Sequence, residues 1–141
     1  MIRKDITPEI INKDYNRSMT KALGIEFTEI GEDYVCAKMP VNELTKQPFG
    51  ILHGGASVVL AESLGSIGSN MMVDISKQNC VGQSINANHI RPVSSGFVYG
   101  KAICVHAGKK THIWEIKITN EEHKLVCTSR LTVAVIDVKK P

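Results

Sequence analysis

The stretch GGASVVLAESLGSIGSNMM, residues 54–72, is the most unusual part of the chain, because Glu62 is its only charged residue. A transmembrane helix is excluded, since the many Gly, Ser and Asn residues leave too little lipid-soluble surface. A helix that is apolar nearly all round must instead be covered by protein, and its small residues let a sheet approach closely. The stretch therefore predicts one central, buried helix.

The remaining sequence predicts the sheet that covers this helix. One alternating run precedes it, at 33–41, and four follow, roughly at 80–90, 97–106, 112–119 and 125–137. The loops at 94–96, 108–110 and 120–122 are short enough for hairpins, so the sheet should be largely antiparallel. We expect an α+β chain in the hot-dog architecture, a curled antiparallel sheet wrapped around one long central helix.

A shorter helix is predicted at the N-terminus. Thr7 is a suitable N-cap and Pro8 occupies the first helical position. The amphipathic segment runs on toward Leu23, and Gly24 is a suitable residue to end it.

Length and composition predict one globular domain spanning residues 1–141. Hydrophobic residues make up 43% of the chain and charged residues 22%, which excludes a disordered or fibrous class. The net charge is +3, but the Lys and Arg residues are too scattered for a nucleic-acid-binding stripe. The first residues lack the apolar stretch of a signal peptide, and the four isolated cysteines fit reduced thiols, so we expect a cytoplasmic protein.

Glu62 is the first candidate for chemistry. An unpaired carboxylate on a buried helix costs several kcal/mol unless it is protonated or partnered, which suggests a function. A weakly solvated carboxylate suits a general base or a nucleophile that attacks an activated ester. The alternative is structural: Ser66, one turn further on, could simply hydrogen-bond Glu62.

Gly54 and Gly55 open the same helix, where backbone N–H groups lack intrahelical acceptors and the helix dipole favours negative charge. An N–H fixed there could stabilise the oxyanion of a thioester intermediate by about 3 kcal/mol. The alternative is that the glycines serve close packing. Gln47, in the preceding loop, could orient water or the carbonyl. His53, at the N-cap position, either caps the helix or takes part in the reaction.

Other catalytic patterns are absent from the sequence. It contains no Gly-x-Ser-x-Gly motif, and its histidines lack the i, i+4 spacing of two zinc ligands on a helix. Residues 108–111 resemble the end of a phosphate loop, but Ile103 stands where that motif needs a glycine. We therefore expect neither a serine hydrolase nor a metalloenzyme nor a nucleoside triphosphatase.

Three motifs carry a family resemblance: QPFGILHGGAS at 47–57, AESLGS at 61–66 and NANHIRPV at 86–93. Together they resemble the hot-dog thioesterases of the phenylacetate-degradation type, most closely the bacterial 1,4-dihydroxy-2-naphthoyl-CoA hydrolases of menaquinone biosynthesis. The resemblance implies a hydrolase that converts an aromatic acyl-CoA to free acid and CoA, with no cofactor beyond the CoA of its substrate. Other members act on different acyl-CoA esters or proofread misloaded carrier proteins, so the acyl group stays open.

The resemblance also implies roles for individual residues. Glu62 would be the nucleophile or general base and the Gly54 N–H the oxyanion donor, with Gln47, His53 and Ser66 beside them. The residues that would bind CoA are Gly82, His89, Ile90, Arg91, Pro92, His106, Gly108, Lys109, Lys110 and Thr111. Physically, the cations among them can bind phosphate through charge-assisted hydrogen bonds, although each lysine alone also fits a solvated hairpin tip. Side chains available for an acyl pocket are Phe49, Leu64, Met71, Met72 and Val73.

Helix geometry predicts self-association. Gly54 and Glu62 are eight residues apart, hence about 12 Å apart along one helix, so both cannot contact the same carbonyl. If both act on it, the smallest active unit is a two-fold dimer with two shared sites. The resemblance favours a dimer of dimers. Two other functions remain open on the same fold, a non-catalytic acyl-CoA sensor and a dehydratase, and release of the CoA thiol distinguishes the hydrolase from both.

Overall fold

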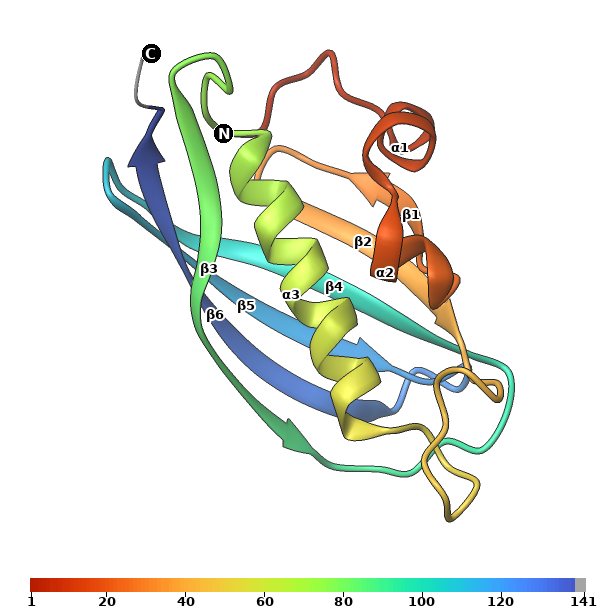
Figure 1. Ribbon diagram of the computed structural model, residues 1–141. Helices are drawn as coiled ribbons and strands as arrows, with labels where there is room; N and C mark the ends of the chain where they lie inside the picture. Colours follow the sequence, from red (N-terminus) through yellow and green to blue (C-terminus); the bar gives the residue numbers. More distant parts are fainter. Residues whose placement is uncertain (139–141) are drawn as a thin grey trace.

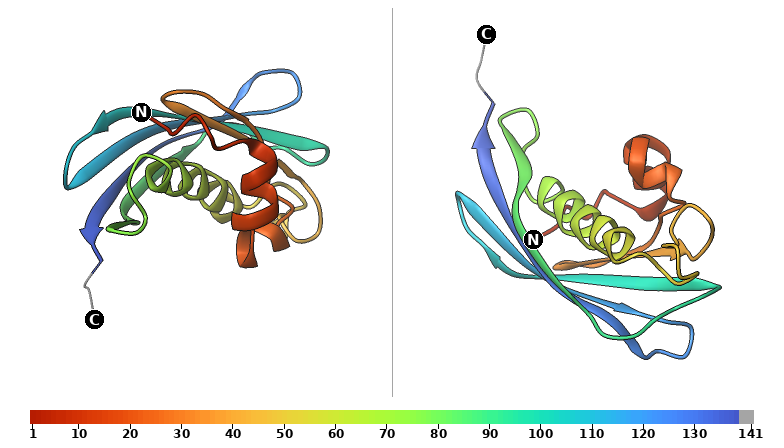
Figure 2. Two further views of the ribbon diagram at one scale, coloured as in Figure 1. Left: turned by 90° about the horizontal axis from the view of Figure 1, so that it is seen from above. Right: turned by 60° about the horizontal axis from the view of Figure 1, so that its bottom comes forward.

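The computed structural model describes residues 1–138, in which six strands form one sheet. The strands lie in the order β1-β2-β4-β5-β6-β3, and every neighbouring pair is antiparallel. The strands are β1 Glu26–Ile30, β2 Tyr34–Pro40, β3 Gln78–His89, β4 Phe97–Ala107, β5 Thr111–Thr119 and β6 Leu125–Asp137. The sheet curls around the single long helix α3, Gly54–Asn70, as Figure 1 and Figure 2 show. The predicted hot-dog fold is confirmed.

Small residues allow α3 to lie directly on the sheet, as the sequence predicted. A Cβ atom at Gly65 would stand 2.6 Å from Leu131, and one at Gly68 would stand 2.5 Å from the Trp114 ring. Trp114 is fully buried, and its Nε1 donates a 2.8 Å hydrogen bond to Ser69 Oγ. The centre of the sheet and the helix therefore share one core.

In the single chain, the predicted central helix α3 is buried more deeply on one face than on the other. Its buried residues lie on the face toward the sheet, namely Ala56, Ser57, Leu60, Ala61, Leu64, Gly65, Gly68 and Ser69. Glu62, Ser63, Ser66 and Ile67 are only half-buried. The physical reason is that the sheet curls past one side of the helix only (Figure 2). One face of α3 is therefore left accessible.

The strand at the open edge corrects one predicted connection. β3 pairs with β6, not with β4, so residues 90–96 form no hairpin but carry the chain from the edge of the sheet to its middle. The other two predicted hairpins, β4–β5 and β5–β6, are confirmed. Within residues 1–138, no strand lies on the outer side of β3, so this edge is free to pair.

The N-terminal segment is broken where one helix was expected. Its pieces are α1 Pro8–Ile10, the π-helical turn η1 Ile11–Tyr15 and α2 Ser18–Ala22. Thr7 caps α1 as predicted, since its Oγ1 accepts the Ile10 N–H. Ser18 has a φ of 54°, which a continuous helix does not allow.

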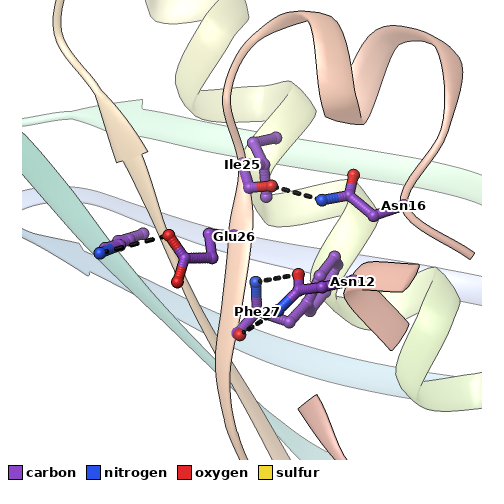
Figure 3. Close-up of polar contacts among 6 residues, drawn as sticks. Asn12, Asn16, Ile25, Glu26 and Phe27 are labelled. Carbon is purple, nitrogen blue, oxygen red and sulfur yellow. Dashed lines mark hydrogen bonds and ion pairs between the residues drawn. The ribbon is translucent and has the colours of Figure 1, made fainter. Parts of the chain in front are cut away.

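Two asparagines tie this segment to β1, a strand that was not predicted (Figure 3). The Asn12 side chain donates to Phe27 O and accepts from Phe27 N, both at 2.8 Å. Asn16 Nδ2 donates to Ile25 O at 2.6 Å. These amides occupy backbone groups that a neighbouring strand would otherwise use.

None of the helices within residues 1–138 is long and apolar enough to cross a membrane. All four cysteines are free thiols, and Cys80 and Cys127 are buried. Burial raises the pKa of both thiols above its ordinary value.

Candidate active site

The first turn of α3 presents one unpaired backbone donor. The imidazole Nδ1 of His53 accepts the Gly55 N–H at 2.8 Å, and the His53 carbonyl accepts those of Ala56 and Ser57. Within residues 1–138, the Gly54 N–H has no hydrogen-bond partner. His53 is therefore the N-cap, and Gly54 is left with a donor at the positive end of the helix dipole.

Glu62 lies two turns further along α3, and its carboxylate points at β3. A Cβ atom at Gly82 would overlap Glu62 Oε1 and stand 3.2 Å from Glu62 Cδ. The carboxylate forms no hydrogen bond or ion pair with another group of residues 1–138. The structural alternative, in which Ser66 hydrogen-bonds Glu62, is therefore not observed. The backbone oxygen of Ser66 instead accepts from Asn70 Nδ2. An unpartnered carboxylate beside a strand is available to react.

A cavity of about 420 Å³ joins the start of α3 to the end of β3. Its polar lining includes Gln47, Gly54, Ser57, His89 and Arg91. His89 lies over the helix start, since a Cβ atom at Gly54 would be 2.7 Å from its Nε2. Two predicted groups thus meet here, the oxyanion-donor end of α3 and the segment 89–92 that the resemblance assigned to CoA.

Ser57, which was not predicted from the sequence, is buried and lines this cavity one turn after Gly54. Its spacing of three residues from Gly54 is a signal that could have identified it. Gln47 is anchored by its own loop, because its Oε1 accepts the Phe49 N–H. Arg91 also has a local partner, donating at 2.7 Å to Leu125 O.

The hairpin 106–111 lies far from this cavity. Along β6, His89 pairs with Cys127 and Thr111 pairs with Ala134, so about 23 Å of strand separates the two predicted CoA segments. At the hairpin end, Lys110 Nζ lies 3.3 Å from Asp137 Oδ2. Hydrogen bonds from Gln78 and from Lys110 lower the pKa of Asp137. One chain therefore does not bring all the predicted CoA-binding residues together.

A second cavity, of about 380 Å³, lies against the C-terminal half of α3. It is lined largely by apolar side chains, among them Ile6, Ile11, Ile67 and Met71. Met71 was one of the predicted acyl-pocket residues. Leu64 is fully buried in the core and Phe49 is 91% exposed, so the single chain places neither of them in a pocket.

Within residues 1–138, the arrangement offers the unpaired Glu62 carboxylate, the unpaired Gly54 N–H and, beside that N–H, a cavity lined by Arg91. Among residues 1–138, no three His, Cys, Asp or Glu side chains are grouped as metal ligands would be. The sequence model of the thioesterase superfamily matches residues 49–127, which include α3, Glu62 and β3. The chain belongs to the thioesterase superfamily.

Similar proteins extend this membership over almost the whole chain. A 1,4-dihydroxy-2-naphthoyl-CoA hydrolase of Escherichia coli is 45% identical over 95% of this chain and 98% of its own length. The proofreading thioesterase EntH of Cronobacter turicensis is 42% identical over 95% of this chain and 97% of its own. A mutant thioesterase of Pseudomonas aeruginosa superposes with a TM-score of 0.93 at 44% identity, covering 97% of this chain and 99% of that one.

This superfamily member is a thioester hydrolase of the acyl-CoA thioesterase type, as the sequence predicted. Membership does not distinguish the roles of Glu62, Gly54, Gln47, His53 and Ser66, which remain predictions. The CoA contacts of the segments 89–92 and 106–111 and of Gly82 also remain predictions.

Proposed function

We propose that the protein hydrolyses an aromatic acyl-CoA thioester to free acid and CoA at sites shared between two copies of the chain. The observation that carries the proposal is the pair of groups on α3 that have no hydrogen-bond partner within residues 1–138. The Gly54 N–H can donate to an oxyanion, and the Glu62 carboxylate can attack or activate water. Both serve the same reaction, yet about 12 Å of helix separates them.

A two-fold axis relating two copies of the chain would bring the two groups together. Gly54 lies level with His89, and Glu62 lies level with Gly82. An axis midway between these levels would pass near residue 58 of α3 and residues 85–86 of β3. It would bring Gly54 of one copy toward Glu62 of the other.

The same axis accounts for the CoA segments at opposite ends of the sheet. Rotation about the middle of β3 exchanges the two ends, so 106–111 of one copy would approach 89–92 of the other. The free edge of β3 supplies the backbone groups for such a contact. The dimer is the smallest active unit in this proposal, and pairs of dimers are compatible with it.

Two routes of hydrolysis fit the arrangement. In one, Glu62 attacks the thioester carbon, CoA leaves as a thiolate, and water then cleaves the resulting anhydride. In the other, Glu62 takes a proton from water, the hydroxide adds to the carbonyl, and the intermediate expels the CoA thiolate, which regains the proton. In both, the negative oxygen of the tetrahedral intermediate faces the Gly54 N–H of the other copy, a contact that typically contributes about 3 kcal/mol.

The aromatic acyl group is supported by similarity to the E. coli hydrolase, whose name specifies a dihydroxynaphthoyl-CoA ester. Similarity to a proofreading thioesterase supports an alternative, a proofreading hydrolase. The apolar cavity beside Ile67 and Met71 is large enough for a fused aromatic ring, since a cavity of about 150 Å³ accommodates benzene.

The test is thiol release from a panel of aromatic and aliphatic acyl-CoA esters, measured for the wild type and for Glu62→Gln. We expect the highest specificity constant with a bicyclic aromatic ester, and at least about a hundredfold lower turnover in Glu62→Gln. Near-wild-type turnover would exclude a catalytic Glu62. A tenfold preference for palmitoyl-CoA over every aromatic ester would exclude the naphthoyl assignment, and acyl-CoA binding without thiol release would indicate a sensor or a dehydratase.

A further inference from the structure

Helix α3 and strand β3 run side by side in opposite directions (Figure 1), and contacts at three levels relate them. His89 lies over Gly54 at the helix start, and Gly82 lies against Glu62 in the middle. Near the helix end, Asn70 hydrogen-bonds Cys80. The Glu62 carboxylate thus faces a strand that comes close to the helix on both sides of it and is hydrogen-bonded to the helix at Asn70.

Asn70 makes the strongest of these contacts. Its Nδ2 donates to Cys80 O at 3.0 Å and to Ser66 O at 2.9 Å, and its Oδ1 accepts the Cys80 N–H at 3.0 Å. The side chain therefore pairs with both backbone groups of Cys80, as a neighbouring strand would. Cys80 is two residues before Gly82 on the same face of β3, so holding one fixes the other to within a short piece of strand.

Gly82 is a glycine for reasons of space. Its φ is not in the left-handed region, so its backbone conformation is open to any residue. A Cβ atom there would overlap Glu62 Oε1, however, and the carboxylate would have to turn away. The strand also has a bulge directly after Gly82, where the register with β6 shifts before Ser84.

We propose that Asn70 and Gly82 are positioning residues for the hydrolysis. Asn70 holds β3 at its distance from α3, and the bare backbone of Gly82 forms the wall that sets the direction of the Glu62 carboxylate. Neither residue contacts the reacting atoms. The inference rests on the proposed catalytic role of Glu62 and adds to it the reason why that side chain stays aligned.

The chain contains a matched control for Asn70. Asn12 makes the same pair of hydrogen bonds to the backbone of a strand residue, Phe27, on the opposite edge of the sheet (Figure 3). Asn12→Ala and Asn70→Ala each remove one amide clamp between a helical segment and an edge strand. A purely structural role for Asn70 predicts that the two folded variants have the same kcat.

The experiment compares kcat and KM for one acyl-CoA ester in Asn70→Ala, Asn12→Ala, Gly82→Ala and Glu62→Gln, each verified as folded by circular dichroism. We expect kcat to fall about tenfold to a hundredfold in Asn70→Ala and Gly82→Ala, because a misplacement of about 1 Å has effects of this size. We expect little change in KM in Asn70→Ala, and wild-type kcat in Asn12→Ala. Gly82→Ala keeps the test valid if Asn70→Ala fails to fold.

A double variant tests the wall directly. Glu62→Asp withdraws the carboxylate by one methylene, which makes room for a methyl group at residue 82. If Gly82 sets the direction of the carboxylate, Gly82→Ala should slow the Glu62→Asp enzyme much less than it slows the wild type. The inference is overturned if Gly82→Ala lowers kcat by the same factor in the wild type and in Glu62→Asp. It is also overturned if Asn70→Ala and Asn12→Ala have equal kcat. If Glu62→Gln itself keeps wild-type turnover, the proposed function fails first, and the inference with it.

Discussion

His53 determines which backbone donor of α3 stays free. Its Nδ1 takes the Gly55 N–H, and its carbonyl takes the next two, so only the Gly54 N–H is left within residues 1–138. We predict that His53→Ala lowers the free energy of unfolding by about 1 kcal/mol, since alanine cannot cap a helix. His53→Asn should restore the cap and keep kcat within about threefold, as measured by urea unfolding and thiol release.

The result that would contradict this role is a stable His53→Asn variant with about a hundredfold lower kcat. The imidazole would then contact the substrate or the leaving thiolate, and capping would be a secondary property. Ser57→Ala serves as a control for the stability measurement alone, because it changes a buried residue of the same cavity without altering the cap.

At the scale of elements, the sequence predicted the regular segments well and their contacts poorly. The bounds of β6 were correct, and those of α3 and β2 to β5 were within two residues, because long alternating runs and a long apolar run are strong signals. β1 was missed because Glu26–Ile30 is short and only Phe27 within it is buried. The N-terminal helix was overpredicted because local propensity does not reveal the positive φ of Ser18.

For the candidate site too, individual residues could be predicted from the sequence, but the contacts between them could not. Glu62 and Gly54 could be identified from sequence, because a lone charge on an apolar helix and a glycine pair at its start are local patterns. The contacts Glu62–Gly82 and Asn70–Cys80 could not. They depend on the antiparallel alignment of α3 with β3 and on the bulge after Gly82, which no local pattern specifies.

The turn between α3 and β3 gives a prediction for pH. Asp74 accepts hydrogen bonds from the Ser76 hydroxyl and N–H and pairs with Lys77 at 3.0 Å, which lowers its pKa to about 2. Because the folded pKa lies below the ordinary value, the carboxylate contributes stability above about pH 4, and this contribution is lost as the pH falls toward 2. Asp74→Asn should therefore be less stable than the wild type at pH 6.

The measurement is urea unfolding of both proteins between pH 6 and pH 2, together with an NMR titration of the Asp74 carboxyl group. The difference in stability should shrink steadily below pH 4. A constant difference across that range, or a titration midpoint near 4, would show that the turn does not hold the charged form of Asp74.

At the scale of the whole molecule, the shared site predicts recovery of activity on mixing. Gly54→Pro removes the oxyanion donor at a position where proline is tolerated, and Glu62→Gln removes the carboxylate. Each alone should be nearly inactive. After subunit exchange, half of the dimers are heterodimers with one intact site, so activity should reach about a quarter of wild type.

Exchange is verified by native mass spectrometry. Gly54→Ala is the matched control, because it adds the Cβ atom that approaches His89 but keeps the N–H, and it should retain most of the activity. Complete exchange without recovery would mean that Gly54 and Glu62 do not act on the same carbonyl.

The asparagine contacts on β1 have a consequence for how the protein behaves at high concentration. A sheet with two bare edges can add copies at both ends and polymerise without limit. Here Asn12 and Asn16 occupy backbone groups of Phe27 and Ile25, while in the described residues 1–138 no strand pairs with the outer edge of β3. Growth through a single self-complementary edge stops at two copies, because pairing consumes the only surface that could continue it. The two amides thus favour a closed particle over a filament. Replacing Asn12 and Asn16 should first cause aggregation on storage.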